Sequence, residues 1–199
     1  PPELYTFIAS SAASVVYKRQ PQYRMSISVP RKLGNQLFVS GIGSVGAVIE
    51  LDSERLAAKI AWKGNSKTAL YTCNSTPFLE DGHVYGVDID SSSLIAARLS
   101  DGKRVWQTKE PTIGDGRGRH GTAFLVKNGD RFFLFNEGGD LISARISPAG
   151  YEETGRFHVL DPTNEAFGRK VVWSHPAFAY RCVFARNDKE LVCVSLAAR

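Results

Sequence analysis

Short segments in which hydrophobic and polar residues alternate run through most of the chain. They include LFVSG (37–41), HVYGVD (83–88), RFFLFNE (131–137) and CVFARN (182–187), all bounded by Gly, Asn or Asp. A period of two places successive side chains on opposite faces of a strand, and Val, Phe and Tyr favour strands. The pattern predicts an all-β protein. Only 6–17 has small residues compatible with a helix, and that stretch ends in Val15-Val16-Tyr17, which favours a strand.

The strand segments recur as four units. Aligned by their first hairpins, the units begin VPRKLGNQLF, TPFLEDGHVY, TAFLVKNGDRFF and HPAFAYRCVF, and their equivalent positions lie 46 to 53 residues apart. A third strand follows in every unit, and the first three units add a fourth. Four strands in a period of this length predict the blades of a β-propeller. We expect one propeller domain or fragment over 1–199, with blades at about 24–63, 76–107, 122–160 and 172–197.

Two kinds of repeated residue have structural roles in this scheme. Trp62 and Trp106 hold matching positions on the fourth strands, where a large ring can wedge between adjacent blades. Gly82 and Gly102 follow an aspartate in hairpin turns, where glycine tolerates positive φ. We therefore expect these four residues to support the architecture.

The second unit carries the fullest version of the pattern. It contains Pro77, Asp81-Gly82, a Leu94-to-Ala97 strand and Asp101-Gly102-Lys103 before Trp106. This arrangement resembles the repeat of the quinoprotein-like (PQQ-like) β-propellers, and the resemblance covers residues 24–197. The stretch from 139 onward also resembles bacterial, largely planctomycete, proteins described as PQQ-binding-like. The resemblance implies a ring of seven or eight blades, of which this chain would be the C-terminal half, and it favours a periplasmic or secreted location.

Closure of the ring leaves three arrangements open. The segment 14–20 could supply the missing fourth strand of the last blade and close a small four-bladed propeller. The chain could instead be a fragment of a larger ring, or two copies could form a homodimer that completes one. An open fragment would expose apolar blade faces, so we favour a fragment that associates with itself.

Composition and charge limit the kinds of partner that we expect for this protein. The chain has 199 residues, 43% of them hydrophobic, and a formal net charge of +5. The basic excess lies within the first 70 residues and is spread over strands and turns, unlike the dense stripe of a nucleic-acid interface, so we expect no nucleic acid. No run approaches the ~20 apolar residues of a transmembrane helix. Three scattered cysteines form no CxxC pair, although Cys182 and Cys193 could face each other on neighbouring strands.

Polar residues gather at one end of the predicted propeller. Strand alternation brings the loops between second and third strands to the same end as the connections between blades. The candidate ligand-binding residues at this end are Asn74, Arg119, His120, Asn136, Glu137, Asp140, His175, Arg186, Asn187 and Asp188. A protein or a small ligand is the expected partner there.

Each candidate also has an ordinary structural interpretation. GDGRGRHG (114–121) could bind an anion, but it matches no phosphate-loop motif and is more typical of a flexible basic loop. His120 and His175 lack a third ligand at metal-site spacing, so we expect no metal site and backbone hydrogen bonds instead. NEGGD (136–140) and RNDKE (186–190) do not follow calcium-loop spacing and are typical of turns.

The sequence favours a non-catalytic scaffold that binds a protein or another ligand, as some propellers with this repeat do. The alternative that the resemblance implies is a quinoprotein dehydrogenase with PQQ and calcium. Such enzymes hold the quinone with an aspartate base, a Cys-Cys pair and a stacked tryptophan, and this chain has no adjacent cysteines. We therefore predict no cofactor and no catalytic residue. A propeller that binds a glycan or small ligand with the same charged end is a further alternative.

Overall fold

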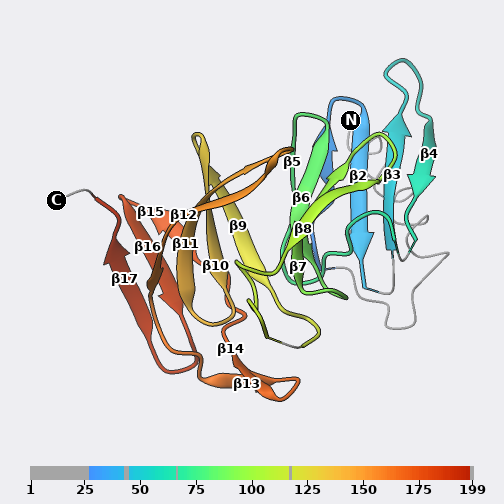
Figure 1. The fold of residues 1–199 in the computed structure, drawn as a ribbon. Helices are drawn as coiled ribbons and strands as arrows, with labels where there is room; N and C mark the ends of the chain where they lie inside the picture. The colour runs from blue at the N-terminus through green and yellow to red at the C-terminus, as the bar shows by residue number, and fades with distance from the viewer. Residues whose placement is uncertain (1–26, 43–44, 66, 117, 198–199) are drawn as a thin grey trace.

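The computed structural model describes residues 27–42, 45–65, 67–116 and 118–197. The described chain is all-β, as the alternating pattern predicts, and its strands form a row of twisted antiparallel sheets (Figure 1). The stretch 6–17 and the candidate closing strand 14–20 lie outside the described residues. Within the described part of the chain, no helix is long and apolar enough to cross a membrane.

Three of the sheets contain four strands in sequential order. The first sheet comprises β1 (Arg31–Leu33), β2 (Gln36–Gly41), β3 (Val45–Leu51) and β4 (Ala58–Lys63). The second comprises β5 (Phe78–Glu80), β6 (His83–Asp88), β7 (Ser93–Arg98) and β8 (Arg104–Thr108). The third comprises β9 (Ala123–Asn128), β10 (Arg131–Asn136), β11 (Asp140–Ser147) and β12 (Gly150–His158). All neighbours pair antiparallel, and the register between the third and fourth strands shifts once in each of these three sheets.

The last part of the described chain departs from this plan. A two-stranded sheet of β13 (Asn164–Ala166) and β14 (Arg169–Val171) occupies the connection after the third sheet. The fourth sheet has three strands, β15 (Ala177–Ala179), β16 (Cys182–Arg186) and β17 (Leu191–Ser195). The connection 164–175 between the third and fourth sheets thus contains a hairpin, which Figure 1 places at the lower end of the molecule.

Adjacent sheets pack face to face through hydrophobic layers. One layer joins the first and second sheets around Phe38 and Ile95, and a second joins the second and third sheets around Tyr85 and Leu134. A third joins the third and fourth sheets around Phe135. The first and fourth sheets lie at opposite ends of the row, and no such layer connects them among the described residues (Figure 1).

The repeated tryptophans lie between sheets. Trp62 on β4 packs against the layer shared with the second sheet, and its indole N–H donates to the carbonyl of Leu99 at 2.8 Å. Trp106 on β8 packs against the next layer and donates to the carbonyl of Ser147 at 2.9 Å. A Cβ added to Gly102, which has a φ of 71°, would lie 2.8 Å from the Trp62 ring. Each ring therefore spans from its own sheet to a hairpin turn of the next.

Candidate functional site

Three loops occupy equivalent places at the lower end, between the second and third strands of the second, third and fourth sheets (Figure 1). Each loop is held by an acidic or amide side chain at the end of the second strand. Asp88 Oδ1 accepts a hydrogen bond from the backbone N–H three residues later at 2.9 Å. Asn136 Oδ1 accepts two, from the N–H groups two and four residues later, at 3.0 and 2.9 Å. Asn187 Oδ1 accepts from two and three residues later, at 2.8 and 2.9 Å. Asn136 and Asn187, which we expected to bind a ligand, thus cap their own loops.

A buried ion pair fixes the β13–β14 hairpin to the third sheet. Glu137 is 4% exposed, and its two carboxylate oxygens accept from Arg169 Nε at 2.6 Å and Nη2 at 3.1 Å. The Trp173 indole N–H donates to the same carboxylate at 3.1 Å. Three charge-assisted or neutral donors therefore compensate a carboxylate that would be costly to bury alone. This arrangement sets the position of the hairpin and of the chain that follows it.

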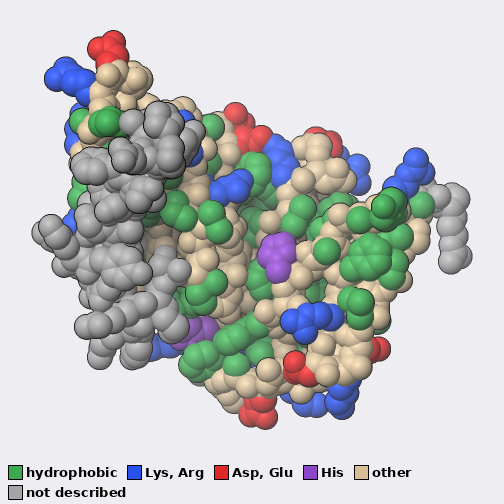
Figure 2. Space-filling model, turned by 180° about the vertical axis from the view of Figure 1, so that it is seen from behind, with side chains coloured by type: hydrophobic (Ala, Val, Ile, Leu, Met, Phe, Trp, Pro, Cys, Tyr) green, Lys and Arg blue, Asp and Glu red, His purple; other side chains and the backbone are tan. Residues whose placement is uncertain are grey.

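The β13–β14 hairpin places the exposed ring of Phe167 against His120, which lies in the connection between the second and third sheets. Phe167 stacks on His120 with ring centroids 4.3 Å apart and an interplanar angle of 9°, and it lies 6.1 Å from Trp173. Phe167 is 65% exposed and Trp173 38% exposed. We call His120, Phe167 and Trp173 the aromatic strip. Seen from behind, hydrophobic side chains gather beside a histidine at the lower end of the molecule, where β13 and β14 lie (Figure 2).

The local backbone and electrostatics of the strip are unusual. Phe167 and His120 both have positive φ, 53° and 63°, which is uncommon for residues other than glycine. Burial lowers the pKa of His120, and the positive charge of Arg169 lowers it further. The imidazole is therefore held toward its neutral form.

Two hollows flank the aromatic strip. Asn74 and His120 line a cavity of about 10 Å³, the scale of one water molecule. At the other end, Trp173, Arg186 and Asp188 line a hollow of about 130 Å³, together with Thr163, Asn164, Val171, Val172, Ser174 and Asn187. Five of the expected ligand-binding residues thus come together in two separate places, Asn74 with His120 and Arg186 with Asn187 and Asp188.

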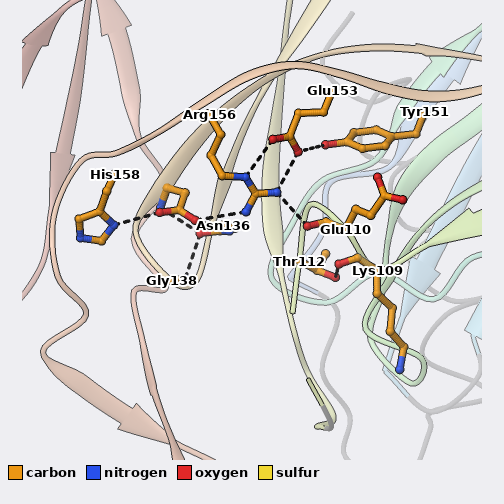
Figure 3. A network of polar contacts seen from close by, with 10 residues as sticks. Lys109, Glu110, Thr112, Asn136, Gly138, Tyr151, Glu153, Arg156 and His158 are labelled. Atoms are coloured by element: carbon orange, nitrogen blue, oxygen red, sulfur yellow. Dashed lines mark hydrogen bonds and ion pairs between the residues drawn. The ribbon is translucent and has the colours of Figure 1, made fainter. Parts of the chain in front are cut away.

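Asp140 belongs to a different network. It pairs with His158 at 2.9 Å and with Arg156 at 3.3 Å, and Arg156 also holds Glu153 and the carbonyl of Glu110 (Figure 3). Hydrogen bonding to Arg156 lowers the pKa of Glu153. The network borders a groove of about 780 Å³ between the end of β8 and β12. Its charges satisfy one another, so it serves to hold β12 against the second-to-third sheet connection.

The two remaining expected residues lie outside these arrangements. His175 Nδ1 is 2.8 Å from the carbonyl of Pro176, and its ring packs against Phe124 at 4.9 Å between centroids. Arg119 is exposed and makes no hydrogen bond or ion pair within the described residues. Neither residue lines the two hollows at the ends of the strip.

The sequence pattern does not single out Phe167, Arg169 and Trp173, because the hairpin that positions them interrupts the blade repeat. A local signal was present. NEAFGRKV (164–171) has two short segments around Phe167-Gly168, the spacing of a two-residue hairpin with a glycine. No comparable signal indicates the ion pair between Glu137 and Arg169, because 32 residues separate them along the chain.

The described residues at this end do not fit a quinone and calcium. Calcium requires several carboxylate or carbonyl oxygens, and the described residues include no group of three His, Cys, Asp or Glu side chains that could hold a metal ion. Trp62 and Trp106 lie between sheets and are not positioned to stack on a quinone in the axis. We therefore derive no chemistry through such a cofactor.

Comparisons with known proteins establish the class of fold. No protein-family model and no sequence of a curated protein matches the chain. Among solved structures, BamB from Moraxella catarrhalis matches with a TM-score of 0.54 and 9% identity, over 83% of this chain and 41% of BamB. A europium-containing methanol dehydrogenase matches over 69% of this chain and 27% of its own length, with a TM-score of 0.39 and 16% identity. The N-terminal domain of Nup159 matches over 82% and 46%, with a TM-score of 0.43 and 12% identity.

The chain is therefore an all-β protein built from propeller blades. More particularly, it is structurally similar to PQQ-like β-propellers such as BamB. At 9% identity this likeness concerns the fold alone. The chain spans less than half the length of each solved structure it is compared with.

Proposed function

We propose that the protein is a non-catalytic binding scaffold and that the aromatic strip is the centre of its binding surface. The observation that carries this proposal is the exposed Phe167 ring, stacked at 4.3 Å on His120 at the end where the connecting loops meet. Exposed aromatic anchors backed by well-ordered neighbours contribute much of the energy of binding surfaces. Loops at one end of a rigid sheet scaffold are common positions for such surfaces.

The backbone of the strip supports the same proposal. A bulky residue at positive φ costs about 1 kcal/mol or more and persists where the surroundings over-determine it. Phe167 and His120 both adopt this conformation, and the buried Glu137–Arg169 pair holds the hairpin in place. A ring that is held rigidly before binding loses little conformational entropy when a partner covers it.

A variant of Phe167 tests the location of the surface. Immobilised protein is screened by surface plasmon resonance against a mixed library of peptides, oligosaccharides and small molecules. We expect Phe167→Ala to weaken the selected ligands at least tenfold, the effect of losing about 1.4 kcal/mol at an anchor. The matched control is Tyr180→Ala, because Tyr180 is 95% exposed and also has positive φ in a hairpin turn.

The results of these binding experiments distinguish a binding scaffold from an enzyme. Ligands that bind wild type and Phe167→Ala equally well would place the binding surface elsewhere and contradict the proposal. A stoichiometric chromophore retained after incubation with PQQ and calcium would favour the quinoprotein alternative. Retention in Phe167→Ala as well would separate that cofactor from the aromatic strip.

A further inference from the structure

We propose that the hollow beside Trp173 binds one pyranose ring of a neutral glycan. The hollow measures about 130 Å³ and combines an exposed indole with Arg186 and Asp188. This inference rests on the proposed function, because Trp173 belongs to both the hollow and the aromatic strip. It goes further by assigning the chemical class of the ligand.

The charged groups of the hollow are available to a ligand. Within the described residues, neither the Arg186 guanidinium nor the Asp188 carboxylate makes a hydrogen bond or ion pair. The backbone N–H of Asp188 donates to Thr163 Oγ1 at 3.2 Å, and this contact holds the loop that carries the carboxylate. Neighbouring Asn187 is fully engaged in its own loop and with the carbonyl of Asp161. A donor fork at the end of β16 and an acceptor in the loop that follows therefore stand two residues apart.

That combination matches adjacent sugar hydroxyls. Each hydroxyl donates one hydrogen bond and accepts others, so a vicinal pair can accept from a guanidinium and donate to a carboxylate together. A free anion such as phosphate would bind Arg186 but be repelled by Asp188, which lines the same hollow. A neutral polyol satisfies both side chains without bringing a second charge into the site.

Trp173 supplies the remaining element. The face of an indole ring carries negative charge density, which attracts the weakly positive C–H groups on one side of a pyranose ring. The hydrogen bond from the indole N–H to Glu137 at 3.1 Å fixes the ring in place. Drug-sized ligands use pockets of about 300 Å³ or more, whereas this hollow suits a single small ring. The adjacent exposed Phe167 would extend the platform to a second sugar unit.

The test uses the full chain and an array of neutral oligosaccharides, followed by saturation-transfer NMR with the strongest binder. We expect Asp188→Asn and Arg186→Met each to weaken binding about tenfold or more, because the first removes the charge of the acceptor and the second removes the charged donor. Both side chains are exposed, so the folded state tolerates these changes. Asp90→Asn is the matched control, since Asp90 is exposed in the corresponding loop of the second sheet and lies outside the hollow.

The outcomes distinguish this inference from the proposed function. Binding of no neutral glycan at millimolar concentration would overturn the glycan assignment, as would equal binding by wild type and both hollow variants. If peptides or other ligands still depended on Phe167 in that case, the scaffold function would stand without the glycan. Glycan binding lost in Asp188→Asn and kept in Asp90→Asn would support the inference.

Discussion

Replacing Trp62 by alanine tests how the blades hold together. The indole packs against the layer between the first and second sheets, with the Phe38 ring 6.3 Å away. Its N–H satisfies the carbonyl of Leu99 on the next sheet at 2.8 Å. The ring also covers Gly102, whose hypothetical Cβ would lie within 2.8 Å of it. Trp62→Ala therefore removes apolar contact and a hydrogen bond between blades at once.

The expected cost follows from these contacts. Truncation of a core Trp to Ala costs about 3 to 5 kcal/mol, and Trp62 is only partly buried, so the lower half of that range applies. This range already includes the carbonyl left without its donor, whose share is about 1 kcal/mol. We expect the free energy of unfolding to fall by about 3 to 4 kcal/mol in urea titrations. Ile60→Ala, on the same strand and 41% exposed, is the control and should cost less than about 1 kcal/mol.

A double-mutant cycle tests the contact between the Trp62 ring and the turn at Gly102. Gly102→Ala introduces a Cβ against the Trp62 ring at a residue whose φ is 71°. In wild type it should cost about 1 to 2 kcal/mol for the backbone and a further 1 to 3 kcal/mol for overpacking. In the Trp62→Ala background only the backbone cost should remain. Additivity of the two substitutions within about 0.5 kcal/mol would refute the contact between ring and turn.

Three further predictions concern charges and thiols. Glu137→Gln should destabilise the protein by about 3 kcal/mol in urea titrations, because it leaves a largely buried guanidinium without its counter-charge; a cost below about 1 kcal/mol would contradict this. The hydrogen bond to Asp140 raises the pKa of His158, so this pair stabilises the fold below about pH 6.5 and loses that contribution as pH rises through the raised pKa; His158→Gln should flatten the pH dependence of the urea midpoint. Iodoacetamide should label exposed Cys193 well before Cys73, which is buried with a pKa raised to about 11, as measured by peptide mass spectrometry; equal rates would contradict the burial of Cys73.

The blades could be predicted because the same packing of one sheet against the next recurs in each of them. Alternation in HVYGVD and RFFLFN assigns successive side chains of β6 and β10 to opposite faces of the strand. Both faces are largely buried, because the repeat supplies a neighbouring blade on each side. Trp62 and Trp106 added a signal, since matching rings on the fourth strands need a partner outside their own sheet. These features are local or periodic, and so they are visible in one sequence.

The arrangement of the candidate site could be predicted only in part. Topology brought the loops to one end, and this placed His120 and Asp188 near the strip and its hollow. Topology could not distinguish Asp140, whose carboxylate pairs with His158 and Arg156 on the neighbouring strand β12. Which side chains pair with one another across distant parts of the sequence depends on their rotamers and on strand register. The pattern of residue types specifies neither.

The capped loops explain how one blade design carries different surfaces. Asp88, Asn136 and Asn187 occupy equivalent positions and hold their loops through backbone N–H groups. Because that one side chain determines the course of the loop, the next residue is free to differ: it is Ile89, Glu137 and Asp188 in the three blades. Ile89 fills a core, Glu137 anchors the inserted hairpin, and Asp188 lines a hollow. The residue after the cap thus determines what each loop contributes at this end, and exchanging Ile89 or Glu137 with Asp188 would also remove core packing or the anchor of the hairpin.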